Sequence, residues 1–330
     1  MQDFGDSFCL TLLTSDPTLA AAADRAGVDR VGLDFERLDK AARQSGHDTR
    51  LSDHGLDDLE RIARCLTHAD LFLRIDPVNP QTESDIEQAL ARGVKVLMLP
   101  FFRTAAEVDT FVRLLDRRAR TVILLETAPA AVRVREIVRV PGIDEVMLGL
   151  NDLRLALGVA SHFEVLASPL LDALAAEIHA AGLPLSLGGV ARVGDTSLPI
   201  APDLVFAPYP RLGARGAWLS RAFVGSSRDG DLAAAVVALR RRLTHWALAS
   251  PQDLENGDTV VAKLNGQTTV KLYFQRDDDI VLEPANANYP PTLVRPSDDM
   301  LVLGRVIGVI RRLRPPVVTA AAVAAVSEEA

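Results

Sequence analysis

Short apolar runs, separated by amphipathic segments, recur along the first two thirds of the chain. The runs that predict buried strands are Cys9–Leu13, Arg30–Leu33, Leu71–Ile75, Val94–Leu99, Val122–Leu125, Glu145–Leu148, Pro184–Leu187 and Asp203–Phe206. Helical patterns lie between most of them, for example at Thr82–Arg92 and Ala105–Arg118. Eight strands alternating with helices favour an α/β fold of the (β/α)₈ TIM-barrel type. The alternative is an open doubly wound sheet, which the lack of a Gly-rich phosphate-binding turn after the first strand disfavours.

The pattern changes after Gly225, where a polar stretch indicates a linker. An Ala/Arg-rich helix is expected next, and period-two alternation then predicts strands, with a hairpin turn signal at Asn265-Gly266. The predicted organisation has four parts: a barrel at 1–225, a linker helix at 226–249, a small mostly-β module at 250–314 and a tail at 315–330.

Composition describes an ordinary globular protein of 330 residues, 48% of them hydrophobic. The net charge of −8 does not favour nucleic acid. Cys9 and Cys65 are far apart, which is typical of two buried thiols in a reducing compartment. The N-terminus lacks the basic segment of a signal peptide, and no apolar run approaches the ~20 residues that span a bilayer. A cytoplasmic protein with no membrane contact is therefore predicted.

Two of the predicted strands end in a carboxylate. Glu126 directly follows the predicted strand Val122–Leu125. Asp152 follows the sixth predicted strand, Glu145–Leu148, a few residues after Gly149. The carboxyl ends of parallel strands meet at one end of a barrel, so the two acids are expected to bind a hard divalent cation such as Mg²⁺. Glu126 would be costly to bury without a partner. Asp152 has an alternative interpretation as the N-cap of a helix that starts at Leu153.

Arg74, at the end of the third strand, supplies a cation beside these acids. Its guanidinium can clamp a carboxylate in a bidentate fork, and the alternative is an ordinary surface ion pair. With a metal ion polarising a carbonyl, Arg74 would hold a 2-oxo acid such as pyruvate, and Gly149 and Pro100 would line its binding site. The cation would stabilise an enolate oxygen while a neighbouring carbon–carbon bond breaks or forms, and a general base would move a proton.

Five segments carry a resemblance to the HpcH/HpaI aldolase and citrate lyase beta-subunit family over residues 8–222. They are LDFER (33–37), LRIDPVNP (73–80), DIEQALARGVKVLMLP (85–100), ILLETAPA (123–130) and REIVRVPGIDEVMLGLNDLRLALG (135–158). The resemblance implies a lyase that uses Mg²⁺ or Mn²⁺, with Glu126 and Asp152 as metal ligands and Arg74 binding the substrate carboxylate. It also implies a small-molecule oxo-acid or acyl-CoA substrate. We further expect a homo-oligomer.

The chain departs from this family at two places. Class II pyruvate aldolases carry a His where Arg37 stands and a Gln where Leu124 stands. Neither the aldolase nor the citrate lyase substrate can therefore be carried over. His47 and His54, in the insertion after the second strand, are the candidates for the general base, and the alternative is that both are solvated loop residues.

The segment 251–313 resembles the C-terminal half of LexA-type S24 serine peptidases, through NGDTVVA, TVK and GRVIGVIRRL. The resemblance implies that Lys271 stands where that family has its general base. The GxSM turn that carries the nucleophilic Ser is missing. This disfavours a Ser–Lys peptidase, and a regulatory protein with a barrel sensor and an inactive self-association module is the alternative to a lyase.

Overall fold

The computed structural model describes residues 4–36, 55–195, 203–225, 229–248, 257–276, 279–284, 289–295 and 297–306. The chain divides into two compact units, Met1–Asp253 and Leu254–Ala330.

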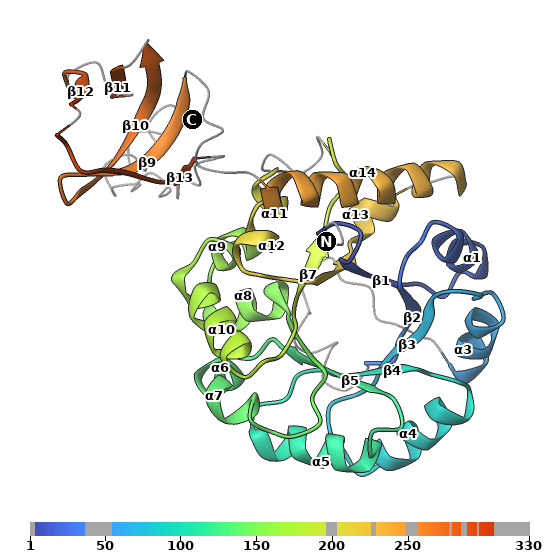
Figure 1. Cartoon of the computed structure of the whole chain (residues 1–330). Coiled ribbons are helices and arrows are strands. Elements are labelled where there is room, and N and C mark those ends of the chain that lie inside the picture. The colour runs from blue at the N-terminus through green and yellow to red at the C-terminus, as the bar shows by residue number, and fades with distance from the viewer. Residues whose placement is uncertain are drawn as a thin grey trace, which may run out of the picture. The chain divides into compact units, whose positions relative to one another are not determined.

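The first unit is a closed barrel of parallel strands, which confirms the predicted TIM-barrel fold (Figure 1). Consecutive strands pair around the ring, and β8 closes it against β1, with Cys9 beside Gly216. The strands are β1 (Cys9–Leu13), β2 (Arg30–Asp34), β3 (Asp70–Arg74), β4 (Val96–Leu99), β5 (Arg120–Leu125), β6 (Glu145–Leu148), β7 (Leu185–Val190) and β8 (Gly216–Leu219).

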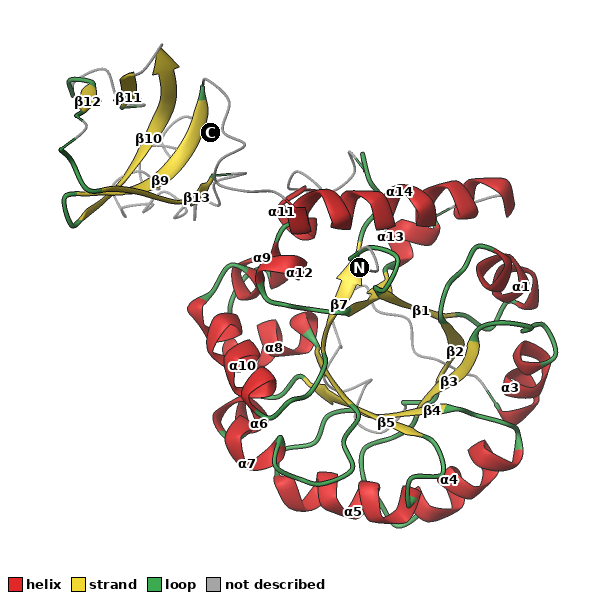
Figure 2. Ribbon diagram, viewed as in Figure 1, coloured by secondary structure: helices red, strands yellow, loops and turns green. Residues whose placement is uncertain are grey.

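Helices surround the barrel on its outside (Figure 2). They are α1 (Pro17–Arg25), α3 (Leu56–Ala63), α4 (Thr82–Ala91), α5 (Ala105–Leu115), α6 (Ala128–Val132), α7 (Val134–Ile137), α8 (Leu150–Leu157), α9 (His162–Leu166), α10 (Pro169–Ala180), α11 (Asp203–Phe206), α12 (Pro208–Arg211), α13 (Arg221–Val224) and α14 (Asp229–Leu248).

The sequence prediction of the eighth strand was wrong. Asp203–Phe206 forms the short helix α11, and the eighth strand is Gly216–Leu219. A four-residue apolar run is too short for its hydrophobic periodicity to distinguish a strand from a buried helical turn. The sequence Gly-Ala-Trp-Leu of β8 also contains Gly and Ala, which are uncommon in strands.

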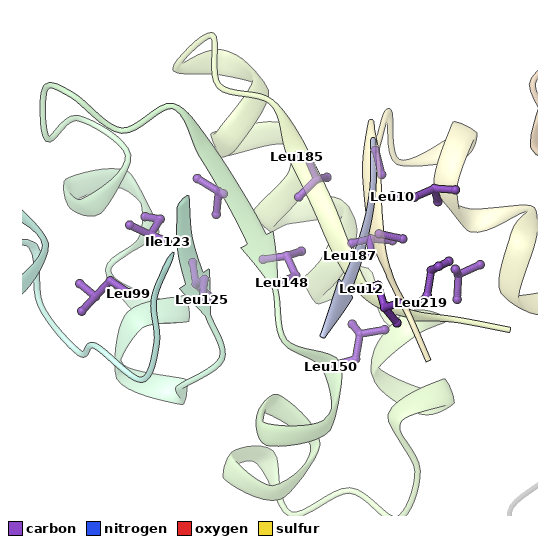
Figure 3. Close-up of a cluster of buried hydrophobic side chains, with 14 of the residues drawn as sticks. Leu10, Leu12, Leu99, Ile123, Leu125, Leu148, Leu150, Leu185, Leu187 and Leu219 are labelled. Carbon is purple, nitrogen blue, oxygen red and sulfur yellow. The ribbon is translucent and has the colours of Figure 1, made fainter. Parts of the chain in front are cut away.

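Two apolar regions hold the barrel together. Side chains that alternate toward the barrel interior form a small cluster of Phe72, Val96, Met98, Val122, Leu124 and Met147. Side chains of the opposite phase, such as Leu99, Ile123, Leu125 and Leu148, pack between the strands and the surrounding helices (Figure 3). Buried polar residues lie at both ends of the interior, with Arg74 and Glu126 at the carboxyl ends of the strands and Arg30 and Glu145 at the amino ends.

Helix α14 belongs to the packing of the barrel unit. Leu232, Val236, Leu239 and Leu243 recur at helical spacing and are buried in the main core. On the same helix, Arg240 donates hydrogen bonds to the carbonyl oxygens of Gly5, Phe8 and Gly27. The barrel unit consequently continues past Gly225 to the end of this helix.

The second unit is an antiparallel sheet in the order β12-β11-β10-β9-β13. Its strands are β9 (Asp258–Leu264), β10 (Gln267–Arg276), β11 (Asp279–Glu283), β12 (Thr292–Val294) and β13 (Met300–Arg305). Its small core contains Val260, Ala262, Tyr273, Leu282 and Val294. This confirms the predicted β module and the hairpin at Asn265-Gly266, where both residues have positive φ angles.

Within the described parts of the chain, no helix combines the length and the apolar character that a membrane crossing requires.

Candidate active site

Arg74 is the last residue of β3 and lies at the carboxyl end of the barrel. Its side chain is buried, and the residue is only 7% exposed. Asp34, the last residue of the paired strand β2, accepts two hydrogen bonds from it, one from Nε at 2.8 Å and one from Nη2 at 2.5 Å. This bidentate geometry fixes the plane of the guanidinium.

Two further groups surround the guanidinium. Nη1 of Arg74 lies 3.2 Å from Oε2 of Glu36, and the Trp218 ring lies beneath it, with its centroid 5.1 Å from Cζ. Burial alone would lower the pKa of Arg74, but the charges of Asp34, Glu36 and Glu126 together raise it above the ordinary value. Arg74 therefore remains a cation in this buried position.

Glu126 follows β5 directly and is 3% exposed. Its Oε1 accepts a hydrogen bond of 3.2 Å from the backbone N–H of Phe101, which follows β4 and Pro100. Phe101 has a φ of 52°, in the left-handed region that a residue of this size rarely adopts. The chain thus turns sharply at the end of β4 so that a backbone donor faces the Glu126 carboxylate.

Gly149 separates Glu126 from the start of α8. A Cβ atom at Gly149 would lie 2.7 Å from Oε2 of Glu126, so only glycine leaves room for this carboxylate. Gly149 is also the N-cap of α8, and Asp152 stands in the first turn of that helix. The interpretation of Asp152 as an N-cap is therefore wrong. Leu125 of β5 pairs with Leu148 of β6, so Glu126 and Asp152 both lie at the carboxyl end of the barrel.

Several carboxylates lie at this end of the barrel. Asp34, Glu36, Glu126 and Asp152 stand at or after the carboxyl ends of β2, β5 and β6, and Arg74 contacts Asp34 and Glu36. Oxygen ligands of this kind suit a hard divalent cation. Among the described residues, no group of three or more His, Cys, Asp or Glu side chains is arranged to hold a metal ion. Two carboxylates completed by water and substrate are a usual set of ligands for Mg²⁺.

The structure brings most of the residues predicted from the sequence to this end of the barrel. Glu126 and Asp152 follow neighbouring paired strands, while Pro100 and Gly149 lie beside the Glu126 carboxylate or its backbone donor. The proposed bases, His47 and His54, lie outside the described residues, as does Arg37.

Sequence reasoning missed two groups that position Arg74. The fork of Arg74, expected to hold a substrate carboxylate, faces Asp34, and Trp218 packs under it. The signal for Asp34 was available, because the alternation Arg30, Gly32, Asp34 on β2 places all three in the phase that points inward. Trp218 was hidden by the wrong assignment of the eighth strand.

Comparison with known proteins agrees with the barrel fold. The profile of the HpcH/HpaI aldolase/citrate lyase family matches residues 8–183, more than half of the chain, and the protein belongs to this family. The barrel is similar to the HpcH/HpaI aldolase from Desulfitobacterium hafniense, with a TM-score of 0.51 and 15% identity over 65% of this chain and 86% of that one. It is equally similar to the citrate synthase SbnG, with a TM-score of 0.51 and 16% identity over 66% of this chain and 88% of that one. At this identity the two structures support the fold, and the family supports a lyase of aldolase or citrate-lyase type.

The C-terminal part of the chain has different relatives. The Peptidase S24-like profile matches residues 247–307. The LexA repressor of Caldicellulosiruptor saccharolyticus is 31% identical over 138 residues, which are 41% of this chain and 63% of the repressor. LexA repressor 1 of Geobacter sulfurreducens is 32% identical over 133 residues, which are 40% of this chain and 62% of that repressor. The matches cover less than two thirds of either repressor.

Lys271, which the resemblance places at the position of a peptidase base, lies in the middle of β10. It pairs with Val260, a core residue, and its Nζ is 5.9 Å from the centroid of the Tyr289 ring. The side chain is therefore on the face of the sheet that carries the small core.

Proposed function

We propose that the barrel unit is a divalent-metal-dependent carbon–carbon lyase that makes or breaks a bond next to the carbonyl of a 2-oxo acid such as pyruvate. The observation that carries the proposal is the position of Glu126 and Asp152 after the paired strands β5 and β6, at the same end of the barrel as the buried Arg74. Membership of an aldolase and citrate lyase family supports the same chemistry.

Different residues of the site would bind the metal ion and the substrate carboxylate. Glu126 and Asp152 would hold Mg²⁺ or Mn²⁺, which when bound supplies a positive charge to stabilise an oxygen that becomes negative in the reaction. Asp34 and Glu36 hold Arg74 in place and occupy part of its fork, and the N–H groups that remain on its far edge would bind the substrate carboxylate.

The rest of the site shapes the substrate pocket and moves the proton. Gly149 leaves room for the Glu126 carboxylate, and Gly149 and Pro100 would line the binding site of a small substrate. His54 or His47 would accept the proton from the hydroxyl group at the bond that is cleaved, since imidazole titrates near neutral pH. A homo-oligomer of such barrels is part of this proposal.

Turnover tests the proposal directly. Pyruvate release from 4-hydroxy-2-oxo acids is measured with Mg²⁺, with Mn²⁺ and with EDTA, for the wild type, Glu126→Gln and the matched control Glu136→Gln, an exposed residue on α7. We expect EDTA and Glu126→Gln each to lower kcat/KM by at least about a hundredfold. A metal ion supplies several kcal/mol to the transition state, and about 1.4 kcal/mol is tenfold in rate. Full turnover of Glu126→Gln would refute the assigned site.

A second function is favoured by the outer face of the second unit. Val270 and Leu293 are more than half exposed there, and β12 and β13 are the edge strands of the sheet. Apolar faces and edge strands of this kind pair with further chains. We infer self-association through this sheet. The full-length variant Val270→Lys/Leu293→Lys should have a smaller mass in solution than the wild type, and an equal mass would contradict the inference.

A further inference from the structure

A second polar cavity lies at the amino end of the barrel, opposite the site of Glu126 and Asp152. Its volume is about 550 Å³, and residues at the starts of the strands line it. The lining residues that matter here are Cys9, Arg30, Arg120, Glu145, Ser186 and Arg215, and we call this space the basal cavity. In TIM barrels the catalytic residues belong to the opposite end, so the lyase proposed above leaves the basal cavity without a role.

In the inner part of the basal cavity, the guanidinium of Arg30 has a hydrogen-bond donor without an acceptor among the described residues. Arg30 is 4% exposed, and its Nη2 donates a 2.7 Å hydrogen bond to Oε2 of Glu145. The hydroxyl of Ser186 donates to Oε1 of the same carboxylate at 2.6 Å. Nη1 of Arg30 is buried and has no hydrogen-bond partner among the described residues. Such a donor costs about 1–3 kcal/mol when it is left unsatisfied.

Most of the acidic residues around the basal cavity already have hydrogen-bond or ion-pair partners. Asp24 accepts hydrogen bonds from three backbone N–H groups, those of residues 67–69. Asp29 accepts from the N–H of Leu10 and pairs with Arg240 at 2.9 Å, and Glu145 pairs with Arg30. Burial raises the pKa of Cys9 to about 12, so this residue is a neutral thiol near pH 7 and adds no charge.

Cationic groups remain at the mouth of the basal cavity. Arg120 begins β5 and Arg215 immediately precedes β8, and both are exposed. Arg215 stacks on the ring of Phe4 at 5.3 Å, which leaves its N–H edges available. Neither forms an ion pair with another described residue, and Asp70 is the lining acid that remains to oppose them. Three guanidinium groups of the lining, those of Arg30, Arg120 and Arg215, therefore still have donors to offer, and Asp70 is the carboxylate that remains to accept from them.

We propose that the basal cavity binds a small anion with several oxygen acceptors, either phosphate or a small polycarboxylate, through Arg30, Arg120 and Arg215. The anion would give Arg30 Nη1 its missing acceptor and would balance the two arginines at the mouth. The shared requirement is a compact cluster of negatively charged oxygens, which guanidinium groups recognise in a bidentate manner. The binding is independent of the lyase site and of its metal ion.

Calorimetric titration of the full-length protein tests this assignment. Inorganic phosphate and citrate are titrated separately in the presence of EDTA, so that a divalent cation at the other end of the barrel cannot contribute. The variants are Arg120→Gln/Arg215→Gln and the two corresponding single substitutions. The matched control is Arg113→Gln/Arg133→Gln, which removes the same charge from exposed positions outside the cavity.

We expect one anion to bind per barrel in the wild type, in the matched control and in Glu126→Gln. The double variant should bind it at least about tenfold more weakly, since a charged hydrogen bond contributes about 1.5–3 kcal/mol. The anion should also raise the Tm of the wild type more than that of the double variant. Tighter binding of phosphate or of citrate identifies the class of ligand. Absence of binding by the wild type, or equal affinity in the double variant and both single variants, would overturn the proposal.

Discussion

At the scale of single residues, the site depends on how Arg74 is held. Asp34 fixes the plane of the guanidinium through two hydrogen bonds, Glu36 faces Nη1, and the Trp218 ring covers one face. The proposed binding of a substrate carboxylate would cost this guanidinium little entropy, because it is already restrained on these sides. The positioning residues therefore belong to the site as much as Arg74 does.

Substitution of Trp218 tests this restraint. Trp218→Leu removes the aromatic face under Arg74, whereas Trp218→Phe keeps a smaller one. A cation–π contact contributes about 0.5–2 kcal/mol, so Trp218→Leu should raise the KM for the oxo acid by about twofold to thirtyfold. Trp218→Phe should lie between Trp218→Leu and the wild type in steady-state kinetics. Equal KM values for all three proteins would show that the stacking has no part in substrate binding.

Substitution of Gly149 tests a second contact at the scale of single residues, the one with the Glu126 carboxylate. The side chain of Gly149→Ala would meet the Glu126 carboxylate at 2.7 Å, so Glu126 must move and divalent-metal affinity should fall about tenfold or more. The matched control is Gly55→Ala at the N-cap of α3, where a Cβ atom meets nothing within 4 Å. Titration with Mn²⁺ compares the two variants, and an unchanged affinity in Gly149→Ala would mean that Glu126 does not bind the metal.

At the scale of elements, much of the barrel could be predicted from the sequence. The first seven strands were recognised, because a buried parallel strand is a short, mostly apolar run. The eighth was missed because Gly216–Leu219 is short and has poor strand propensity, while Asp203–Phe206 imitates a strand. Helix α14 was expected as a linker from its Ala and Arg content, although the spacing of Leu232, Val236, Leu239 and Leu243 already indicated a buried face.

The packing of α14 gives a stability prediction. Leu239→Ala removes a fully buried side chain and should lower the free energy of unfolding of the barrel by about 2–5 kcal/mol. Val237→Ala is the control, since Val237 on the same helix is 46% exposed and its replacement should change stability by less than about 1 kcal/mol. Denaturant unfolding followed by circular dichroism measures both. Equal effects would mean that α14 does not pack on the barrel in solution.

At the scale of the whole molecule, the chain combines a lyase-family barrel with a sheet related to S24 peptidases. The proposed metal ligands could be placed from the sequence, because an acid after each of two consecutive strands fixes its position at the carboxyl end of a barrel. Asp34 could have been placed from its inward phase on β2, next to β3. The groups of the basal cavity required the structure, because their partners come from strands that are not neighbours. Glu145, for example, meets Arg30 from the other side of the barrel interior.

Metal binding tests the central claim most directly. Mn²⁺ is titrated into the full-length wild type, Glu126→Gln, Asp152→Asn and the control Glu136→Gln, and free Mn²⁺ is followed by electron paramagnetic resonance. The account predicts one bound ion per chain in the wild type and in the control, and an affinity at least about tenfold weaker in each of the other two variants. Wild-type affinity in both Glu126→Gln and Asp152→Asn would contradict it.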